Sequence, residues 1–161
     1  MRRTDLSRPS FYVYFRDRHH LVLRVVEHLG SELFTMSDRW LRGSGEGPEL
    51  ARAALDGIVA VYVEHGPVMR ALADAAVDDA GIEAAYNELV QSFIEATARH
   101  IEEEIAAGRI LKLSAHETAT ALVWMMERYL TLSLGRDPMT PAQTVADTLA
   151  TIWNRVLYGA G

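Results

Sequence analysis

The fold is decided by a stretch that is apolar on almost every side, ATALVWMMERYLTLSL, which occupies residues 119–134. A helix on a protein surface has one polar face, whereas a helix that is apolar all round must be covered on both sides. One side of this helix can pack on its own bundle. The other side is covered either by deep burial within the monomer or by a second copy of the chain. We favour the second copy, because little chain remains after this stretch.

A charged pair, Glu127-Arg128, interrupts the apolar stretch. A charge that is buried away from water needs a partner. Two arrangements remain open: Glu127 pairs with the arginine of a second copy, or either side chain reaches outward to water.

Helical spacing recurs along the rest of the chain, and signals for strands are nearly absent. Apolar residues three and four positions apart run through residues 21–34, 50–62, 82–101 and 145–157. We expect one helix to end before Asp17, which can cap the next helix. We expect further helix ends in segments rich in Gly and Pro or in Asp, at residues 43–48, 65–67, 78–81 and 135–141. Ser114 and Glu117 have the spacing of a capping box. The sequence therefore predicts an all-α bundle of about seven helices.

Composition narrows the class of protein. A chain of 161 residues with 49% hydrophobic residues forms one domain, or one domain with a remnant of another. No uncharged run is long enough for a membrane span, so we expect no membrane association. The absence of cysteine excludes disulfides, thiolate metal sites and cysteine nucleophiles, and it suits the cytoplasm, where we place the protein.

The charge is distributed unevenly. Residues 1–18 hold five arginines against two aspartates, a net +3, and because the whole chain carries −6, the remainder carries −9. A basic end on an acidic body is typical of a segment that contacts phosphates, but it also fits a solvated terminus. Charge alone leaves both interpretations open.

Catalytic and metal-binding patterns are weak. No Glu-x-x-His pair occurs, which excludes the usual di-iron bundle. His100, Glu103 and Glu104 share a helix face, and we interpret them as a solvated charged face rather than a metal site. The glycine-rich residues 43–47 follow a helix and lack the lysine of a phosphate loop, so we interpret them as a linker. We therefore expect no enzyme activity, no metal and no cofactor.

Large aromatic and methionine side chains recur on the expected inward faces of several helices. One interpretation is plain core filling. The other is a cavity for an apolar ligand, because adaptable Met and aromatic side chains line such cavities between bundle helices. Composition does not separate a filled core from a hollow one.

A second motif, LSRPSFYVYF, occupies residues 6–15 and places four aromatic residues in five positions. Ser7 can cap a short helix, and Pro9 suits its first turn. This motif resembles the recognition helix of TetR-family transcriptional regulators, which lies in the major groove of DNA. The resemblance continues in LSAHETATAL at residues 113–122, MER at 126–128 and TLATIW at 148–153, and it points to the EthR-like branch of that family.

The resemblance implies a dimeric repressor that responds to a ligand. Residues 1–20 are then a remnant of the helix-turn-helix domain, without its first two helices, and residues 21–161 form the ligand-binding and dimerisation domain. By motif position, the residues implied to contact DNA are Ser7, Arg8, Pro9, Ser10, Tyr12, Tyr14 and Arg18. The residues implied to line the ligand cavity are Tyr62, Tyr86, Phe93, Val123, Trp124, Met126 and Trp153.

Two departures from the family pattern bear on these sites. Asp5 stands where the family turn has Gly, which is a mild change because Asp tolerates unusual backbone angles. Val123 and Met126 stand where related members carry asparagines that bind a ligand, so we expect a drier cavity.

The expected function is that of a TetR-type repressor in which a hydrophobic small molecule in the bundle controls operator binding. The expected partners are a second copy of the chain, bound through the last two helices, the effector molecule, and operator DNA when the missing N-terminal helices are present. The alternative is a dimeric module that binds small molecules independently of DNA and carries a vestigial N-terminus.

Overall fold

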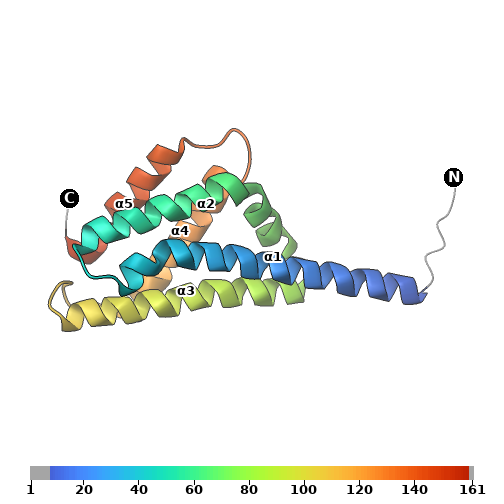
Figure 1. Ribbon diagram of the computed structural model, residues 1–161, viewed down its shortest axis with the longest axis horizontal. Coiled ribbons are helices and arrows are strands. Elements are labelled where there is room, and N and C mark those ends of the chain that lie inside the picture. Colours follow the sequence, from blue (N-terminus) through green and yellow to red (C-terminus); the bar gives the residue numbers. More distant parts are fainter. Residues whose placement is uncertain (1–7, 160–161) are drawn as a thin grey trace.

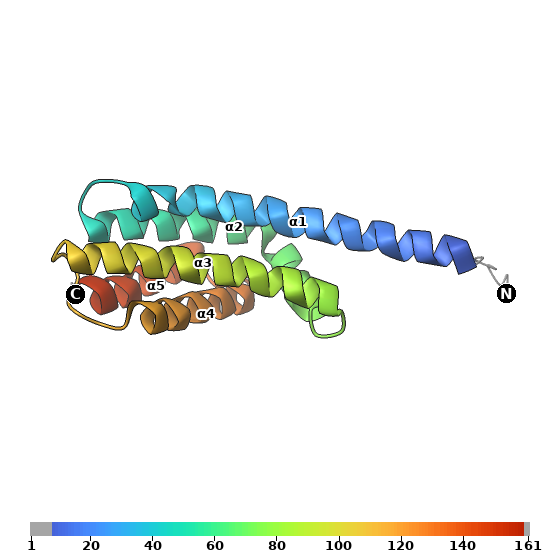
Figure 2. The ribbon, with the colours of Figure 1, turned by 90° about the horizontal axis from the view of Figure 1, so that it is seen from below.

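The protein is a bundle of five α-helices in the computed structural model, which describes residues 8–159, with side chains from residue 18 onward. The helices are α1 (Arg8–Arg42), α2 (Gly47–Ala75), α3 (Ala80–Ala106), α4 (Ala115–Leu134) and α5 (Ala142–Tyr158). Helices α1 and α3 run side by side, and the N-terminal turns of α1 project beyond the other helices (Figures 1 and 2). The prediction of an all-α bundle is confirmed, but the count of about seven helices is wrong.

Two of the expected helix breaks do not occur. Helix α1 runs unbroken through Asp17, so that residue does not begin a separate helix, and the expected domain boundary after residue 20 falls inside α1. Helix α2 continues through Pro67 and bends in its C-terminal part (Figure 1). Proline removes one backbone hydrogen bond, and a helix can accommodate that loss by bending rather than ending.

A close approach of two backbones keeps this bent region in place. A Cβ atom on Gly66 would lie 2.1 Å from the carbonyl oxygen of Leu134, at the end of α4. Only glycine allows the chain to pack at that distance. Contact between α2 and α4 therefore stabilises α2 as one continuous helix at residues 65–67, where the local sequence predicts that it ends.

The helix ends follow local sequence at some points and depart from it at others. Gly159 adopts the left-handed conformation after α5, with φ 64°, as a C-terminal cap requires. Ser114 makes no capping hydrogen bond, so the predicted capping box at α4 is wrong. The side chain of Asp79 caps α3 instead, and it accepts hydrogen bonds from the backbone N–H groups of Gly81 (2.9 Å) and Ile82 (3.1 Å).

Helix α2 lies at the centre of the bundle and packs against α1, α4 and α5, while α3 packs against α1 and α4. The largest fully buried side chains include Ile94 and Ile101 of α3, Leu130 and Leu134 of α4, and Leu149 of α5. Burying one such side chain contributes about 1.5–3 kcal/mol to folding. All five helices therefore contribute to one continuous core.

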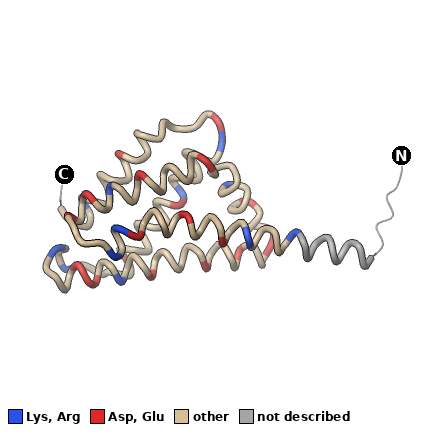
Figure 3. Tube along the Cα trace, viewed as in Figure 1, with Lys and Arg blue, Asp and Glu red and all other residues tan. Residues whose placement is uncertain are grey.

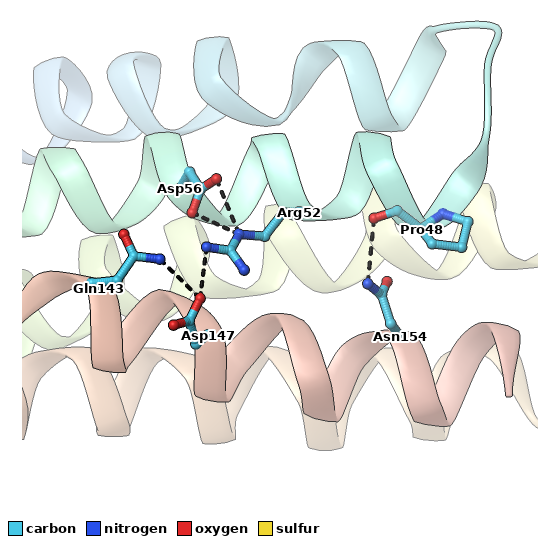
Figure 4. A network of polar contacts seen from close by, with 6 residues as sticks. All are labelled: Pro48, Arg52, Asp56, Gln143, Asp147 and Asn154. Atoms are coloured by element: carbon cyan, nitrogen blue, oxygen red, sulfur yellow. Dashed lines mark hydrogen bonds and ion pairs between the residues drawn. The ribbon is translucent and has the colours of Figure 1, made fainter. Parts of the chain in front are cut away.

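A network of polar contacts joins α2 to α5 on the outside of the bundle (Figure 4). The guanidinium of Arg52 lies 2.9 Å from the carboxylate of Asp56 on its own helix and 2.7 Å from that of Asp147 on α5. Farther along, the side-chain amide of Asn154 donates to the carbonyl oxygen of Pro48 (3.3 Å). Exposed ion pairs add little stability, so these contacts chiefly set the alignment of α5 on α2.

Acidic and basic residues are interspersed along the described helices (Figure 3). Among these helices, none is both long and apolar enough to cross a membrane.

Candidate ligand-binding site

Two small apolar chambers lie inside the bundle. The first, of about 40 Å³, is bounded mainly by α2, α3 and α4, and its lining includes Tyr62, Met69, Tyr86, Val90 and Leu130. The second, of about 20 Å³, lies toward the end of the bundle where α1 stops, and its lining includes Trp40, Leu55 and Trp153. Each chamber is too small for an organic effector as it stands.

Only side chains separate the two chambers. Ile58, Phe93 and Met126 line both. The ring of Phe93 stacks on that of Phe34 with a centroid distance of 4.0 Å, which ties it to α1. Met126 is the flexible member of the partition, because methionine is unbranched and changes rotamer readily.

One polar cluster stands in the wall of the first chamber. Glu127 lines it, and its Oε1 atom accepts hydrogen bonds from the phenol of Tyr86 and from the hydroxyl of Thr131, the latter at 2.9 Å. Burial, followed by the nearby Tyr62 and Glu127, raises the pKa of Tyr86. Burial also raises the pKa of Tyr62, and the charge of Glu127 adds to that effect. Both phenols therefore remain protonated at neutral pH.

The cluster shows where the two members of the charged pair in α4 lie within one chain. Glu127 is half-buried at the chamber wall, where hydroxyl groups donate to one of its oxygens, whereas Arg128 is exposed. Sequence reasoning missed Glu127 as a lining residue, although its charge within an apolar stretch was a usable signal.

Five of the residues implied to line a cavity do so, namely Tyr62, Tyr86, Phe93, Met126 and Trp153. Val123 is buried but lines neither chamber. Trp124 also lines neither, and 40% of it is exposed, so its assignment to the cavity is corrected. Successive residues of a helix are about 100° apart, so Trp124 points nearly opposite to Met126.

The far end of the bundle holds a separate polar pocket of about 200 Å³, lined in part by Trp40, His100, Glu104 and Arg109. His100 and Glu104 are only 8% and 7% exposed, so the expectation of a solvated face is wrong for them. Arg109 donates to both carboxylate oxygens of Glu104, at 2.6–3.0 Å, and this contact lowers the pKa of Glu104. Among the residues with described side chains, no group of three His, Asp or Glu residues is arranged to hold a metal.

Large apolar side chains are exposed on the last two helices. Trp124 (40%), Leu132 (51%) and Val156 (46%) lie on α4 and α5. The sequence predicts that one side of α4 needs an external cover. In the single chain, Trp124 and Leu132 of α4 and Val156 of α5 are left open to solvent.

The residues implied to contact DNA lie at the start of the chain. Ser7 lies outside the described residues. The next five belong to the first turns of α1, where the structure describes the backbone only: Arg8, Pro9, Ser10, Tyr12 and Tyr14. Arg18 is exposed on α1.

Comparison with known proteins relates this arrangement to a family. The family described as "Transcriptional regulator EthR, C-terminal domain" matches residues 51–159, which contain α3, α4, α5 and most of α2. The chain is also 27% identical, over 157 residues, to the HTH-type transcriptional regulator EthR of Mycolicibacterium smegmatis. That alignment covers 96% of this chain and 72% of the relative.

Proposed function

The chain belongs to the family of the transcriptional regulator EthR, C-terminal domain, and on that premise we propose that it is a TetR-type repressor controlled by an apolar small molecule. The observation that carries the proposal is the pair of apolar chambers parted by Met126. This family consists of regulators and not of enzymes, and the coarser assignment to transcription regulation rests on the family match and on the related EthR protein.

The effector enters by opening the partition. The chambers of about 40 and 20 Å³ hold little more than water when separate. When Met126 turns aside, an elongated apolar molecule can reach from Tyr86 to Trp153. The buried indole N–H of Trp153 has no partner among the described residues, so it can donate to an acceptor atom of the effector. Ile58, Phe93 and Met126 keep the middle of this path apolar.

The active form is a dimer joined through α4 and α5. Trp124, Leu132 and Val156 are exposed on these two helices, and a twofold axis would let the same surface on two copies cover them. The interface would also supply the second cover that α4 requires.

Control of DNA binding follows from the spacing of the two copies. The projecting end of α1 carries the residues implied to contact DNA, and two such ends must lie about 34–36 Å apart to reach successive major grooves. An effector that favours a different spacing by about 1–3 kcal/mol weakens DNA binding about 5- to 150-fold. Helix α1 also contributes Leu33 to the first chamber. A ligand that displaces Leu33 can therefore shift the DNA-binding end of the same helix.

The test is fluorescence anisotropy with the DNA that flanks the gene. It is measured on this chain and on the chain extended by any residues encoded in frame upstream of Met1. We expect salt-dependent binding that falls when an apolar compound raises the melting temperature of the protein. Arg18→Ala should lower the dependence of log affinity on log salt by about one. Compound binding without any DNA binding in either protein would favour the DNA-independent module instead.

A further inference from the structure

We propose that the effector carries a protonated amine that binds the carboxylate of Glu127, with its apolar body extending past Met126. This inference rests on the proposed function and specifies the chemical class of the effector.

The carboxylate has capacity for a ligand. Both hydroxyl donors, from Tyr86 and Thr131, bind the same oxygen, Oε1. The other oxygen, Oε2, receives no hydrogen bond from any side chain that the structure describes. A carboxylate accepts about four hydrogen bonds through its two oxygens, so one oxygen remains open to a further donor.

The carboxylate also lacks a counter-charge. Within residues 18–159, no Arg, Lys or His forms an ion pair with Glu127. The adjacent Arg128 is exposed and does not neutralise it. Glu127 is half-buried in a largely apolar wall, where its charge is compensated by the hydroxyl donors and by partial contact with solvent rather than by an opposite charge. A ligand cation supplies the missing charge.

The rest of the chamber suits a cation better than an anion. Tyr62, Tyr86 and Phe93 line it, and the face of an aromatic ring attracts a cation. No basic side chain lines the chamber, so an acidic ligand would meet a negative charge with no compensation. The ammonium group would lie in the first chamber beside Glu127. The alkyl or aryl part would extend past Met126 into the second chamber, which must widen as the partition opens.

The experiment uses three probes with the same alkyl chain: n-octylamine, n-octanol and n-octanoate. Their dissociation constants are measured by titration calorimetry at neutral pH, below the concentration at which each probe aggregates. We expect n-octylamine to bind about tenfold more tightly than n-octanol, and n-octanoate to bind most weakly, because hydrogen bonds between charged groups are stronger than neutral ones.

Two variants identify the group responsible. Glu127→Gln keeps the shape and the acceptor for Tyr86 but removes the charge, so n-octylamine should lose its tenfold advantage while n-octanol binds as before. Thr131→Val removes one hydroxyl donor and keeps the charge, so the preference for the amine should persist. The matched control is Glu88→Gln, an exposed position on α3 that lies outside the chamber lining.

The outcomes separate the two proposals. If the wild type binds the amine and the alcohol equally, or if Glu127→Gln retains the preference, the effector class is wrong while the cavity stands. If none of the three probes binds, the apolar effector cavity itself is wrong, and this inference is overturned with it.

Discussion

The indole Nε1 of Trp40 donates a hydrogen bond to the phenol oxygen of Tyr158 at 2.9 Å, across 118 positions of the chain. The bond joins the C-terminal end of α1 to that of α5. Trp40 is 4% exposed, and its ring meets those of His100 and Trp153 edge-on, with centroid distances of 4.4 and 5.5 Å. This group of rings closes the end of the bundle beyond the second chamber.

Removing the phenol oxygen of Tyr158 should destabilise the end of the bundle where α1 and α5 stop. Tyr158→Phe leaves a buried indole N–H without its partner, which costs about 1–3 kcal/mol of unfolding free energy. The measurement is urea unfolding monitored by circular dichroism. Tyr129→Phe is the matched control, because Tyr129 is half-buried and its hydroxyl makes no hydrogen bond with any described residue. Equal loss in both variants would contradict the role of the Trp40 bond.

The close approach of Gly66 on α2 to Leu134 on α4 can be tested by substitution. Gly66→Ala should destabilise the protein by about 1–3 kcal/mol, because the new Cβ would lie 2.1 Å from the backbone oxygen of Leu134, which cannot rotate away. Gly30→Ala, on α1, meets at close range only Cδ1 of Leu89 (2.7 Å), the far end of a flexible side chain, and should cost far less. Denaturant midpoints of the two variants compare these costs directly, and similar midpoints would argue against a tight crossing.

Truncating the partition should join the chambers. Met126→Ala is expected to lower the unfolding free energy by about 2–5 kcal/mol, and n-octanol should restore part of that loss by filling the space. Leu149→Ala serves as the control, because Leu149 is fully buried but lines neither chamber. Thermal unfolding with and without n-octanol distinguishes the two. If n-octanol stabilised Leu149→Ala as much as Met126→Ala, its effect would not be local to the chambers.

Charges on the α4–α5 face should prevent dimerisation. Trp124→Glu combined with Leu132→Glu places two carboxylates on the exposed part of α4, and in a dimer joined there both would be desolvated without a partner. Sedimentation velocity should show a dimer for the wild type and a monomer for the variant. Val77→Glu, at a position 82% exposed after the end of α2, should remain dimeric. A monomeric wild type at high concentration would refute the interface.

The buried His100 should make the protein sensitive to acid. Burial, as the largest effect, lowers the pKa of His100 below its ordinary 6.5, against the opposing effects of Glu104, Glu103 and a hydrogen bond to the Leu41 backbone; Arg109 adds to the lowering. The unfolded chain therefore binds a proton at higher pH than the native protein, and stability is lost as pH falls from about 6.5 toward the lowered value.

The check is the unfolding free energy as a function of pH. His100→Gln should flatten the decline between neutral and mildly acid pH, whereas His116→Gln, at an exposed position, should leave it unchanged. Glu104, whose pKa is also lowered, loses its contribution only at more acid pH, below its ordinary 4.5. A decline that persists unchanged in His100→Gln would assign the acid sensitivity elsewhere.

Local sequence predicted several elements because their signals act within one or two turns. Gly159 ends α5 in the left-handed conformation that the cap requires, and residues 43–46 separate α1 from α2. Local signals failed where distant contacts outweigh them. Pro67 does not end a helix, because packing at Gly66 stabilises continuity by more than the proline destabilises it. Asp17 does not begin a helix, because α1 already runs through it.

For the candidate site, residue type alone identified large inward side chains but not their neighbours. Tyr86 and Met126 were identified as lining residues, and they line a chamber. Trp124 lies about half a helical turn from Met126, so it faces the outside, and residue type gives no sign of this. Glu127 was noticed as a charge in an apolar stretch, but its hydroxyl partner on another helix, Tyr86, lies 41 positions away and has no local signature.

By itself, the sequence determined the helical class, the need of α4 for cover on two sides and the resemblance to a regulator family, since helical period, apolar content and motif are properties of neighbouring residues. The tertiary structure alone decided that α2 bends without ending, that Ile58, Phe93 and Met126 lie between two chambers, and that Glu127 stands in the chamber wall with no basic partner among the described residues. Those features depend on contacts between residues far apart in the chain, where differences of a few kcal/mol select one packing among several that the same pattern allows.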